Sequence, residues 1–269
     1  MNNKKNYLMY GAVIGDIVGS MWEFSMSVED KPLSYDFELF PKDANYTDDT
    51  VMSVAIAYSL LHQLDVSKTM REFAVKYPCP KGGYGGRFSR WLFDDSMGPI
   101  NSFGNGAGMR VSSVGYFASS VEECKLLSKK VTEVTHNHPE GLKGAETISL
   151  MVYYALHNKD LAFLKDYAIS SYPQISSFDY EGLRKNYVHN STCQGSIPEA
   201  LYCFLTSKSF EDCLRRINYI GGDTDTTGAM ACAIASAYYK WIPSFMIEET
   251  KKRLPQIFID TIEAVPLSY

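Results

Sequence analysis

Apolar residues recur at helical spacing through nearly all of the 269-residue chain. Clear cases are the stretches LMYGAVIGDIVGSMWEF, VMSVAIAYSLLHQL and AETISLMVYYALHN, which begin at Leu8, Val51 and Ala145. That spacing puts apolar side chains on one face of an α-helix. Strict alternation of apolar and polar residues is scarce, and no two-residue Asn-Gly turn joins two strand-like runs. The sequence therefore predicts an all-α bundle of about ten or more helices, given typical helix lengths.

No linker and no low-complexity stretch divides the chain, so we expect a single domain over residues 1–269. Two long stretches lack the helical pattern. One runs from Ser25 to Thr47, and the other is the glycine-rich stretch from Pro78 to Asn105. Irregular stretches of this length in a compact domain commonly form lids or binding loops. Both are therefore candidates for such loops.

Charge and cysteine usage limit the class of protein. The formal net charge of −5 gives no basic surface of the kind that binds a nucleic-acid backbone. Six cysteines without a CxxC pair indicate reduced, mostly buried thiols. The apolar stretch near the N-terminus is interrupted by Asp16, and no run is long enough to span a bilayer. We expect a cytoplasmic protein, and a monomer because nothing indicates a large exposed apolar face.

Glycine recurs at every fourth position near the N-terminus, at Gly11, Gly15 and Gly19, on one face of the predicted helix. Each glycine costs roughly 1 kcal/mol relative to alanine inside a helix. Close packing against another helix would offset that cost. Membrane helices pair through the same spacing, but Asp16 lies among these glycines and argues against a membrane helix. The pattern predicts a helix that packs closely on a neighbour.

Two acidic clusters stand immediately before predicted helices. Residues 47–49 read Thr-Asp-Asp, and the second cluster contains Asp223 and Asp225, which point the same way if the backbone is extended, with Thr226 behind them. One such side chain is sufficient to cap a helix, and each cluster alone is more typical of a cap than of a metal site. Together they offer four carboxylates and two hydroxyls, the oxygen ligands that Mg²⁺, Mn²⁺ and Ca²⁺ prefer. A cation between the clusters would also remove their repulsion.

The helix predicted after the second cluster consists of small residues, GAMACAIASA over residues 228–237. Such residues would let a neighbouring helix come close and could bring two helix starts to a shared ion. Ordinary tight packing explains them equally well, so both interpretations stay open.

Three further features are candidates for binding or catalysis. Glu23 follows Asp16 by two helical turns on the same face, and it is either a general acid or base or a solvated residue at a helix end. The stretch NSFGNGAGMR, residues 101–110, would let backbone amides approach an anion, which is a weak phosphate signal by itself. Within it Phe103 could stack on a base or belong to the core. His136 could form a hydrogen bond with a ligand.

Six segments of the chain occur in the order found in the ADP-ribosylglycohydrolase family: GAVIGDIVGSMWEF, YTDDTVMS, FGNGAGMR, THNHPEGLKGAE, GSIPEALYCFL and GGDTDTTGAMACAIASAYY. From about Gly11 to Tyr239 the chain resembles this family, which includes the dinitrogenase-reductase-activating glycohydrolases. The resemblance implies a compact all-α fold, an orthogonal multi-helix bundle, with two divalent ions, Mg²⁺ or Mn²⁺, in a central cleft. The metal ligands that it implies are Thr47, Asp48, Asp49, Asp223, Asp225 and Thr226.

The resemblance also implies roles around the ligand. Glu23 would be a catalytic or metal-gating residue on a mobile loop, and the metal-bound acids Asp49 and Asp225 are further catalytic candidates. The diphosphate of ADP-ribose would lie on the glycine loop, Ser102, Phe103, Gly104, Asn105 and Gly106. Phe103 stands where relatives place an aromatic ring against adenine, and His136 matches a histidine that contacts the ligand.

The function that the resemblance implies is hydrolysis of the bond between ADP-ribose and a modified acceptor, with ADP-ribosyl-arginine on protein as the first expectation. Serine, nucleic-acid and small-molecule ester linkages are alternatives, because they share the ADP-ribose half. A relative that binds ADP-ribose without cleaving it is another. A third class is suggested by the motif that starts at Asp223, which matches the Asp-x-Asp-x-Thr/Val signature of metal-dependent phosphatases. That class needs a parallel sheet after the motif, and too few residues follow Asp225 to build one.

Overall fold

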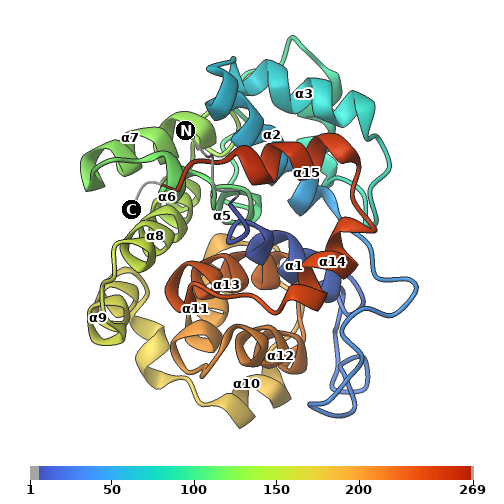
Figure 1. Ribbon diagram of the computed structural model, residues 1–269, viewed down its shortest axis with the longest axis vertical. Coiled ribbons are helices and arrows are strands. Elements are labelled where there is room, and N and C mark those ends of the chain that lie inside the picture. Colours follow the sequence, from blue (N-terminus) through green and yellow to red (C-terminus); the bar gives the residue numbers. More distant parts are fainter. Residues whose placement is uncertain (1–5, 268–269) are drawn as a thin grey trace.

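The computed structural model describes residues 6–267 and shows helices joined by loops, with no sheet in that range (Figure 1). The only pairings of strand type among these residues are isolated bridges, Thr47 to Lys81 and Gly104 to Thr192. The prediction of an all-α protein is therefore confirmed. Backbone amides and carbonyls pair mainly within helices, as the spacing of apolar residues in the sequence predicts.

Two helices at the centre of the molecule, α1 (Tyr10–Gly19) and α13 (Thr224–Tyr239), pack against each other along their lengths (Figure 1). Every residue of α1 is buried, and so is α13 up to Ala237. The glycines of α1 make this contact possible, because a Cβ on Gly11 would lie 2.5 Å from the carbonyl oxygen of Cys232. The predicted close packing of the glycine face is confirmed.

The remaining helices surround this pair in two groups (Figure 1). On α13 pack α8 (Pro139–Leu156), α11 (Ile197–Leu205) and α12 (Phe210–Ile220). A second group contains α2 (Asp48–His62), α3 (Val66–Lys76) and α15 (Gln256–Ala264), and α14 (Ser244–Lys251) lies on α1. The outer helices are α7 (Val121–Thr132), α9 (Leu161–Ser171) and α10 (Tyr180–Asn186), and the short elements are α4 (Gly86–Phe93), α5 (Gly106–Met109), α6 (Val114–Phe117), η1 (Pro173–Ser177) and η2 (Cys193–Gly195).

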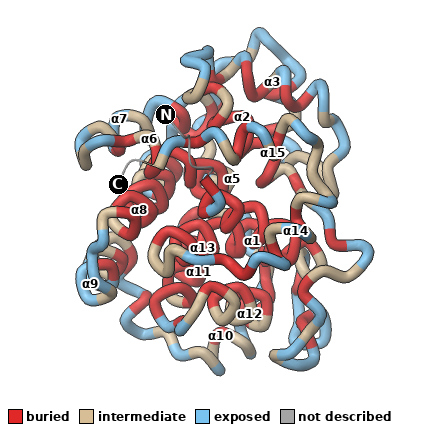
Figure 2. The backbone as a smooth tube through the Cα atoms, viewed as in Figure 1, coloured by how far each residue is buried: buried red, intermediate tan, exposed pale blue. Residues whose placement is uncertain are grey.

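Burial follows this arrangement (Figure 2). The tube is buried through α1, α13 and most of α8, whereas α9, α10 and the loop after α1 are largely exposed. All six cysteines are free, and only Cys79 is exposed, as expected for reduced, mostly buried thiols. Among residues 6–267 no helix has the length and apolar character needed to cross a membrane.

Three local expectations are wrong. Helix α1 ends at Gly19, so Glu23 lies in the turn beyond it and not two helical turns along its face. The stretch from Pro78 to Asn105 is not irregular throughout, because α4 forms within it. The backbone at Asp225 is helical and not extended, since α13 begins at Thr224. The residue at which a helix begins or ends depends on tertiary contacts, and the periodicity of apolar residues does not report these contacts.

Candidate functional site

The two acidic clusters meet at the starts of α2 and α13. The hydroxyl of Thr226 on α13 donates a hydrogen bond to Oδ2 of Asp49 on α2, at 3.3 Å. Burial is the main cause that raises the pKa values of Asp49 and Asp225 well above the usual range, and the charges of the neighbouring carboxylates add to it. The pKa of Asp48 is raised well above its usual range by the same causes. Two segments far apart in the sequence thus form one buried acidic cluster.

These acids line a cavity of about 380 Å³. Most of the predicted site residues share its wall: Glu23, Asp48, Asp49, Ser102, Gly104, Asn105, Gly106, His136, Asp223, Asp225 and Thr226. Two predicted residues lie outside the wall. Thr47 is buried behind it and caps α2, accepting a hydrogen bond from the amide of Asp49 at 3.1 Å. Phe103 is 42% exposed, and its ring lies 5.1 Å from that of His138.

Asp49 and Asp225, which both line the cavity, each keep one oxygen, Oδ1, buried and without a hydrogen-bond partner among the described residues. A buried carboxylate oxygen in this state costs free energy unless a donor or a cation compensates it. No three Asp, Glu, His or Cys side chains in residues 6–267 form a ready metal site by themselves. A cation held here would therefore need a mixed set of donors, with carboxylate oxygens from both helix starts and the threonine hydroxyls beside them.

Asp223 occupies the N-cap position of α13, yet its side chain makes no capping bond. Its Oδ2 instead accepts a hydrogen bond from Nδ2 of Asn105 at 2.6 Å, and its Oδ1 lies 3.9 Å from Nδ1 of His189. This answers the question whether the second cluster is a simple helix cap, because Asp223 faces the cavity and connects α13 to the glycine loop. No motif marked His189 as a site residue.

A further acid, Asp16, forms hydrogen bonds with the residues at the start of α2. It is fully buried in α1, and its Oδ2 accepts hydrogen bonds from the amides of Thr47 at 3.0 Å and Thr50 at 3.1 Å, as well as from the Thr50 hydroxyl. The start of α2, where Asp48 and Asp49 lie, is thereby fixed to α1. Asp16 was not among the predicted site residues. Its signal in the sequence was a carboxylate in the middle of an apolar glycine repeat, where a buried charge needs partners.

Glu23 lies between the cluster and the loop before α4. Gly82 in that loop has a φ of +76°, and a Cβ on it would lie 2.6 Å from Oε2 of Glu23. Burial, followed by the charges of Asp223 and Asp16, raises the pKa of Glu23 to about 7. The loop that follows is held at Lys31, whose Nζ donates to the carbonyl oxygen of Tyr187 at 2.6 Å. Glu23 therefore stands on a short turn between two anchored segments.

The glycine loop uses part of its backbone within the protein. The amide of Gly104 donates to Oγ of Ser102 at 3.1 Å, and the amide of Asn105 donates to the carbonyl oxygen of Ser191 at 2.9 Å. Nε2 of His136 lies close by, 3.4 Å from the position that a Cβ on Gly106 would take. The loop and His136 thus form one part of the cavity wall, which Asn105 connects to Asp223.

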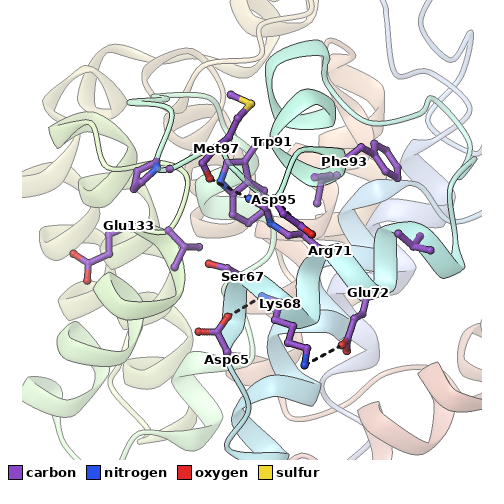
Figure 3. Close-up of a pocket in the computed structure, with 15 residues that line it drawn as sticks. Asp65, Ser67, Lys68, Arg71, Glu72, Trp91, Phe93, Asp95, Met97 and Glu133 are labelled. Atoms are coloured by element: carbon purple, nitrogen blue, oxygen red, sulfur yellow. Dashed lines mark hydrogen bonds and ion pairs between the residues drawn. The ribbon is translucent and has the colours of Figure 1, made fainter.

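A larger groove of about 1010 Å³ lies between α3, α4 and the end of α7, away from the acidic cluster (Figure 3). None of the predicted site residues line it. Arg71 stacks over the ring of Trp91 at 4.3 Å and pairs with Asp95 at 2.8 Å, and Nζ of Lys68 lies 3.9 Å from Glu72. The cations of this groove already have partners within it. The larger volume therefore does not make this groove the better candidate, because the predicted site residues line the smaller cavity.

Comparison with known proteins shows the family to which the chain is similar. The ADP-ribosylglycohydrolase family model matches residues 7–267. The chain is 27% identical to human ADP-ribosylhydrolase ARH3, over 85% of this chain and 83% of that protein. It is also 27% identical to the ADP-ribosyl-dinitrogen reductase glycohydrolase of Rhodospirillum rubrum, with the same coverage of each.

A solved structure described as an ADP-ribosylglycohydrolase-related protein complex superposes on the model with a TM-score of 0.70 at 22% identity. The superposition covers 97% of this chain and 96% of that one, which shows that the fold is the same. Since the family model also extends over nearly all of the sequence, the protein belongs to the ADP-ribosylglycohydrolase family.

Proposed function

We propose that the protein is a divalent-metal-dependent hydrolase that cleaves the glycosidic bond between ADP-ribose and a modified acceptor, with ADP-ribosyl-arginine on protein as its substrate. Family membership supports hydrolysis of a bond to ADP-ribose. The observation that carries the metal part is the pair of buried, unpartnered Oδ1 atoms of Asp49 and Asp225, which come from two helix starts and line one cavity. A cation bound between the two helix starts would compensate these oxygens.

The proposed metal ligands share the two helix starts and supply only oxygen: Thr47, Asp48, Asp49, Asp223, Asp225 and Thr226. Oxygen donors of this kind suit two Mg²⁺ ions, or Mn²⁺ in their place. When bound, such ions supply Lewis acidity, hold the ribose hydroxyls and orient a water. Asn105 would keep Asp223 turned toward the ions through its 2.6 Å hydrogen bond.

The protein groups around the ions would act on the sugar and its leaving group. Positive charge develops on the ribose in the transition state, and nearby carboxylates stabilise it. Asp49 and Asp225 would take that role, since they line the cavity from two helix starts, and Glu23 lines the same cavity from the turn after α1. Glu23 would exchange a proton with the acceptor or the water. Glu23 is the acid of the cavity that is not a proposed metal ligand, and its charge would favour a cationic acceptor such as a guanidinium group, which supports arginine over a neutral hydroxyl linkage.

The other side of the cavity would hold the ADP moiety. Ser102, Gly104, Asn105 and Gly106 offer a backbone that an anion can approach closely, so we place the diphosphate there, beside His136. Phe103 projects outward between two residues of the wall, and we propose that its exposed ring stacks on the adenine.

The test compares linkages directly. Wild-type protein is incubated with ADP-ribose attached to arginine, to serine, to nucleic acid and to a small-molecule ester, and release of free ADP-ribose is measured. We expect release from the arginine conjugate at least tenfold faster than from the others. Faster release from another conjugate would move the proposal to that linkage.

Two other functions are separated by the same experiment. A binding relative without activity would bind ADP-ribose tightly and release nothing from any conjugate. A phosphatase would release inorganic phosphate from a generic phosphate ester, but that chemistry belongs to a parallel-sheet fold, and residues 6–267 form no sheet. Because the described residues form no such sheet, hydrolysis of a bond to ADP-ribose is the function to test.

We also propose that the protein acts as a monomer in the cytoplasm. The free thiols of all six cysteines support a reducing compartment. Size-exclusion chromatography with light scattering checks the monomer, and a mass of twice 30.2 kDa would contradict it.

A further inference from the structure

Arg110 lies directly after α5, is almost inaccessible to solvent, and contributes to the wall of the cavity. Its Nη2 donates hydrogen bonds to Oγ1 of Thr135, at 2.5 Å, and to Nδ1 of His136, at 3.0 Å. Its Nε and Nη1 have no hydrogen-bond partner among the described residues. Burial lowers the pKa of Arg110 to about 10, while the charge of Asp48 opposes this effect, so the guanidinium stays charged at neutral pH. A buried arginine without a carboxylate in contact needs a reason for its position.

The contact with His136 decides which ring nitrogen carries the proton. A guanidinium has only donors, so the nitrogen that faces it at 3.0 Å has to be an acceptor. A proton on Nδ1 would set two donors against each other. Burial, and then the charge of Arg110, lowers the pKa of His136 well below its usual range, which removes the doubly protonated form. The contact with Arg110 therefore favours the neutral ring that carries its proton on Nε2.

Nε2 points into the side of the cavity that the glycine loop forms. It lies 3.5 Å and 3.4 Å from the positions that a Cβ on Gly104 and on Gly106 would take. Without those Cβ atoms, a ligand oxygen can approach the N–H group closely. The donor and the glycine backbone thus face the same small volume.

We propose that Arg110 is a positioning residue that fixes His136 in the Nε2–H tautomer and so makes it an obligate hydrogen-bond donor to an anionic oxygen on the glycine loop. The identity of that oxygen, an oxygen of the ADP-ribose diphosphate, rests on the proposed function. Burial alone would keep the ring neutral, but it would not select a tautomer. The selection comes from the donor-only guanidinium.

Thr135 makes the proposal testable by mutation. Its Oγ1 also lies 2.7 Å from Nδ1 of His136 and can accept a hydrogen bond from a protonated Nδ1. If Arg110 is replaced by methionine, Nδ1 can take the proton and donate it to Thr135. The ring then presents an acceptor at Nε2, which repels a phosphate oxygen. Arg110→Lys keeps a charged donor and should keep the tautomer. Thr135→Val removes the competing acceptor, together with the hydrogen bond that Arg110 donates to it, and leaves the contact between Arg110 and His136 in place.

The first measurement is the ¹⁵N NMR spectrum of the imidazole rings in the full-length protein, with the His136 signals assigned by their loss in His136→Gln. In the wild type, Arg110→Lys and Thr135→Val we expect an unprotonated Nδ1 and a protonated Nε2. In Arg110→Met we expect the reverse. A protonated Nδ1 in the wild type overturns the proposal, even if Arg110→Met does not fold. An unchanged tautomer in folded Arg110→Met overturns it as well.

The second measurement is calorimetric titration with ADP-ribose. Arg110→Met should bind it about tenfold more weakly, as expected for one lost hydrogen bond to a charged group, and Arg110→Lys should recover most of the affinity. If the tautomer reverses and the affinity stays the same, His136 is not a donor to this ligand and the inference fails while the proposed function stands. If no variant and not the wild type binds ADP-ribose, the proposed function fails, and the tautomer result still judges the role of Arg110.

Discussion

Gly15 of α1 and Gly228 of α13 are in direct backbone contact: a Cβ on Gly228 would lie 2.6 Å from the carbonyl oxygen of Gly15. Real Cβ atoms do not approach a backbone oxygen so closely. The contact lies close in sequence to two acids, because Asp16 follows Gly15 and Asp225 precedes Gly228 by three residues. The distance between the helices therefore determines how the acid cluster is assembled.

Replacing Gly15 by alanine should separate the two helices. Because the new methyl group overlaps backbone that cannot move as a side chain does, we expect a loss of about 3 kcal/mol in the free energy of unfolding. The measurement is urea unfolding followed by circular dichroism. Gly86→Ala is the control, since a Cβ there meets nothing within 4 Å, and it should change stability by less than about 1 kcal/mol. Equal effects of the two substitutions would contradict the account.

The sequence allowed this much of the fold to be predicted, because a glycine at every fourth position has few explanations once Asp16 excludes a membrane helix. It did not identify the partner helix. Small residues in α13 are compatible with packing on any neighbour, and only the folded chain pairs α13 with α1. The end of α1 at Gly19 was missed for a related reason, since the apolar pattern continues past the residue where the helix stops.

Asp16→Asn should weaken the attachment of α2 to α1. An amide oxygen accepts less strongly than a carboxylate, and the amide nitrogen is a donor that would face the amides of Thr47 and Thr50. We expect a loss of about 2 kcal/mol in the free energy of unfolding. Asp65→Asn, at an exposed cap of α3, is the matched control and should cost little, because asparagine also caps helices. If Asp16→Asn left the free energy of unfolding unchanged, these hydrogen bonds would not stabilise the fold.

Asp225→Asn should have opposite effects without and with metal. In EDTA the variant should unfold at the same temperature as the wild type or higher, since one of several repelling buried charges is removed. Saturating Mg²⁺ should raise the midpoint of the wild type by roughly 5–10 °C and that of the variant by much less. Asp95→Asn, whose carboxylate is 94% exposed in the other groove, should leave both quantities unchanged. An equal metal response in Asp225→Asn would remove Asp225 from the metal ligands.

Glu199 on α11 should give stability a pH dependence. Burial raises its pKa from 4.5 to about 7, and its Oε2 has no hydrogen-bond partner among the described residues. Between these two pH values the folded state keeps a proton that the unfolded state loses, so the contribution of Glu199 to stability falls as the pH rises.

The size of that loss is at most about 3 kcal/mol. We expect the difference in free energy of unfolding between Glu199→Gln and the wild type to shift in favour of the variant by this order between pH 4 and pH 8. Urea titrations of both proteins at the two pH values measure it, and the comparison removes the contribution of all other groups. A difference that does not change with pH would show that Glu199 has the same pKa in the folded and the unfolded state.

Much of the site was predicted from residue types, and its supporting groups were not. Carboxylates beside threonines at two helix starts indicate a metal site because one cap needs only one of them. Asp16, Arg110 and His189 escaped notice because each acts through a contact with a residue distant in the sequence. His189 in particular lies in a stretch without any motif. Such contacts form only in the folded chain, and no local sequence pattern predicts them.

The most direct test of the account is the initial rate of ADP-ribose release from arginine-ADP-ribosylated protein, measured with Mg²⁺ and with EDTA for the wild type and Asp225→Asn. We expect release by the wild type with Mg²⁺, and a rate at least a hundredfold lower both in EDTA and in the variant. Release that continues undiminished in EDTA and in Asp225→Asn would contradict the claim that two helix starts converge to hold the catalytic ions.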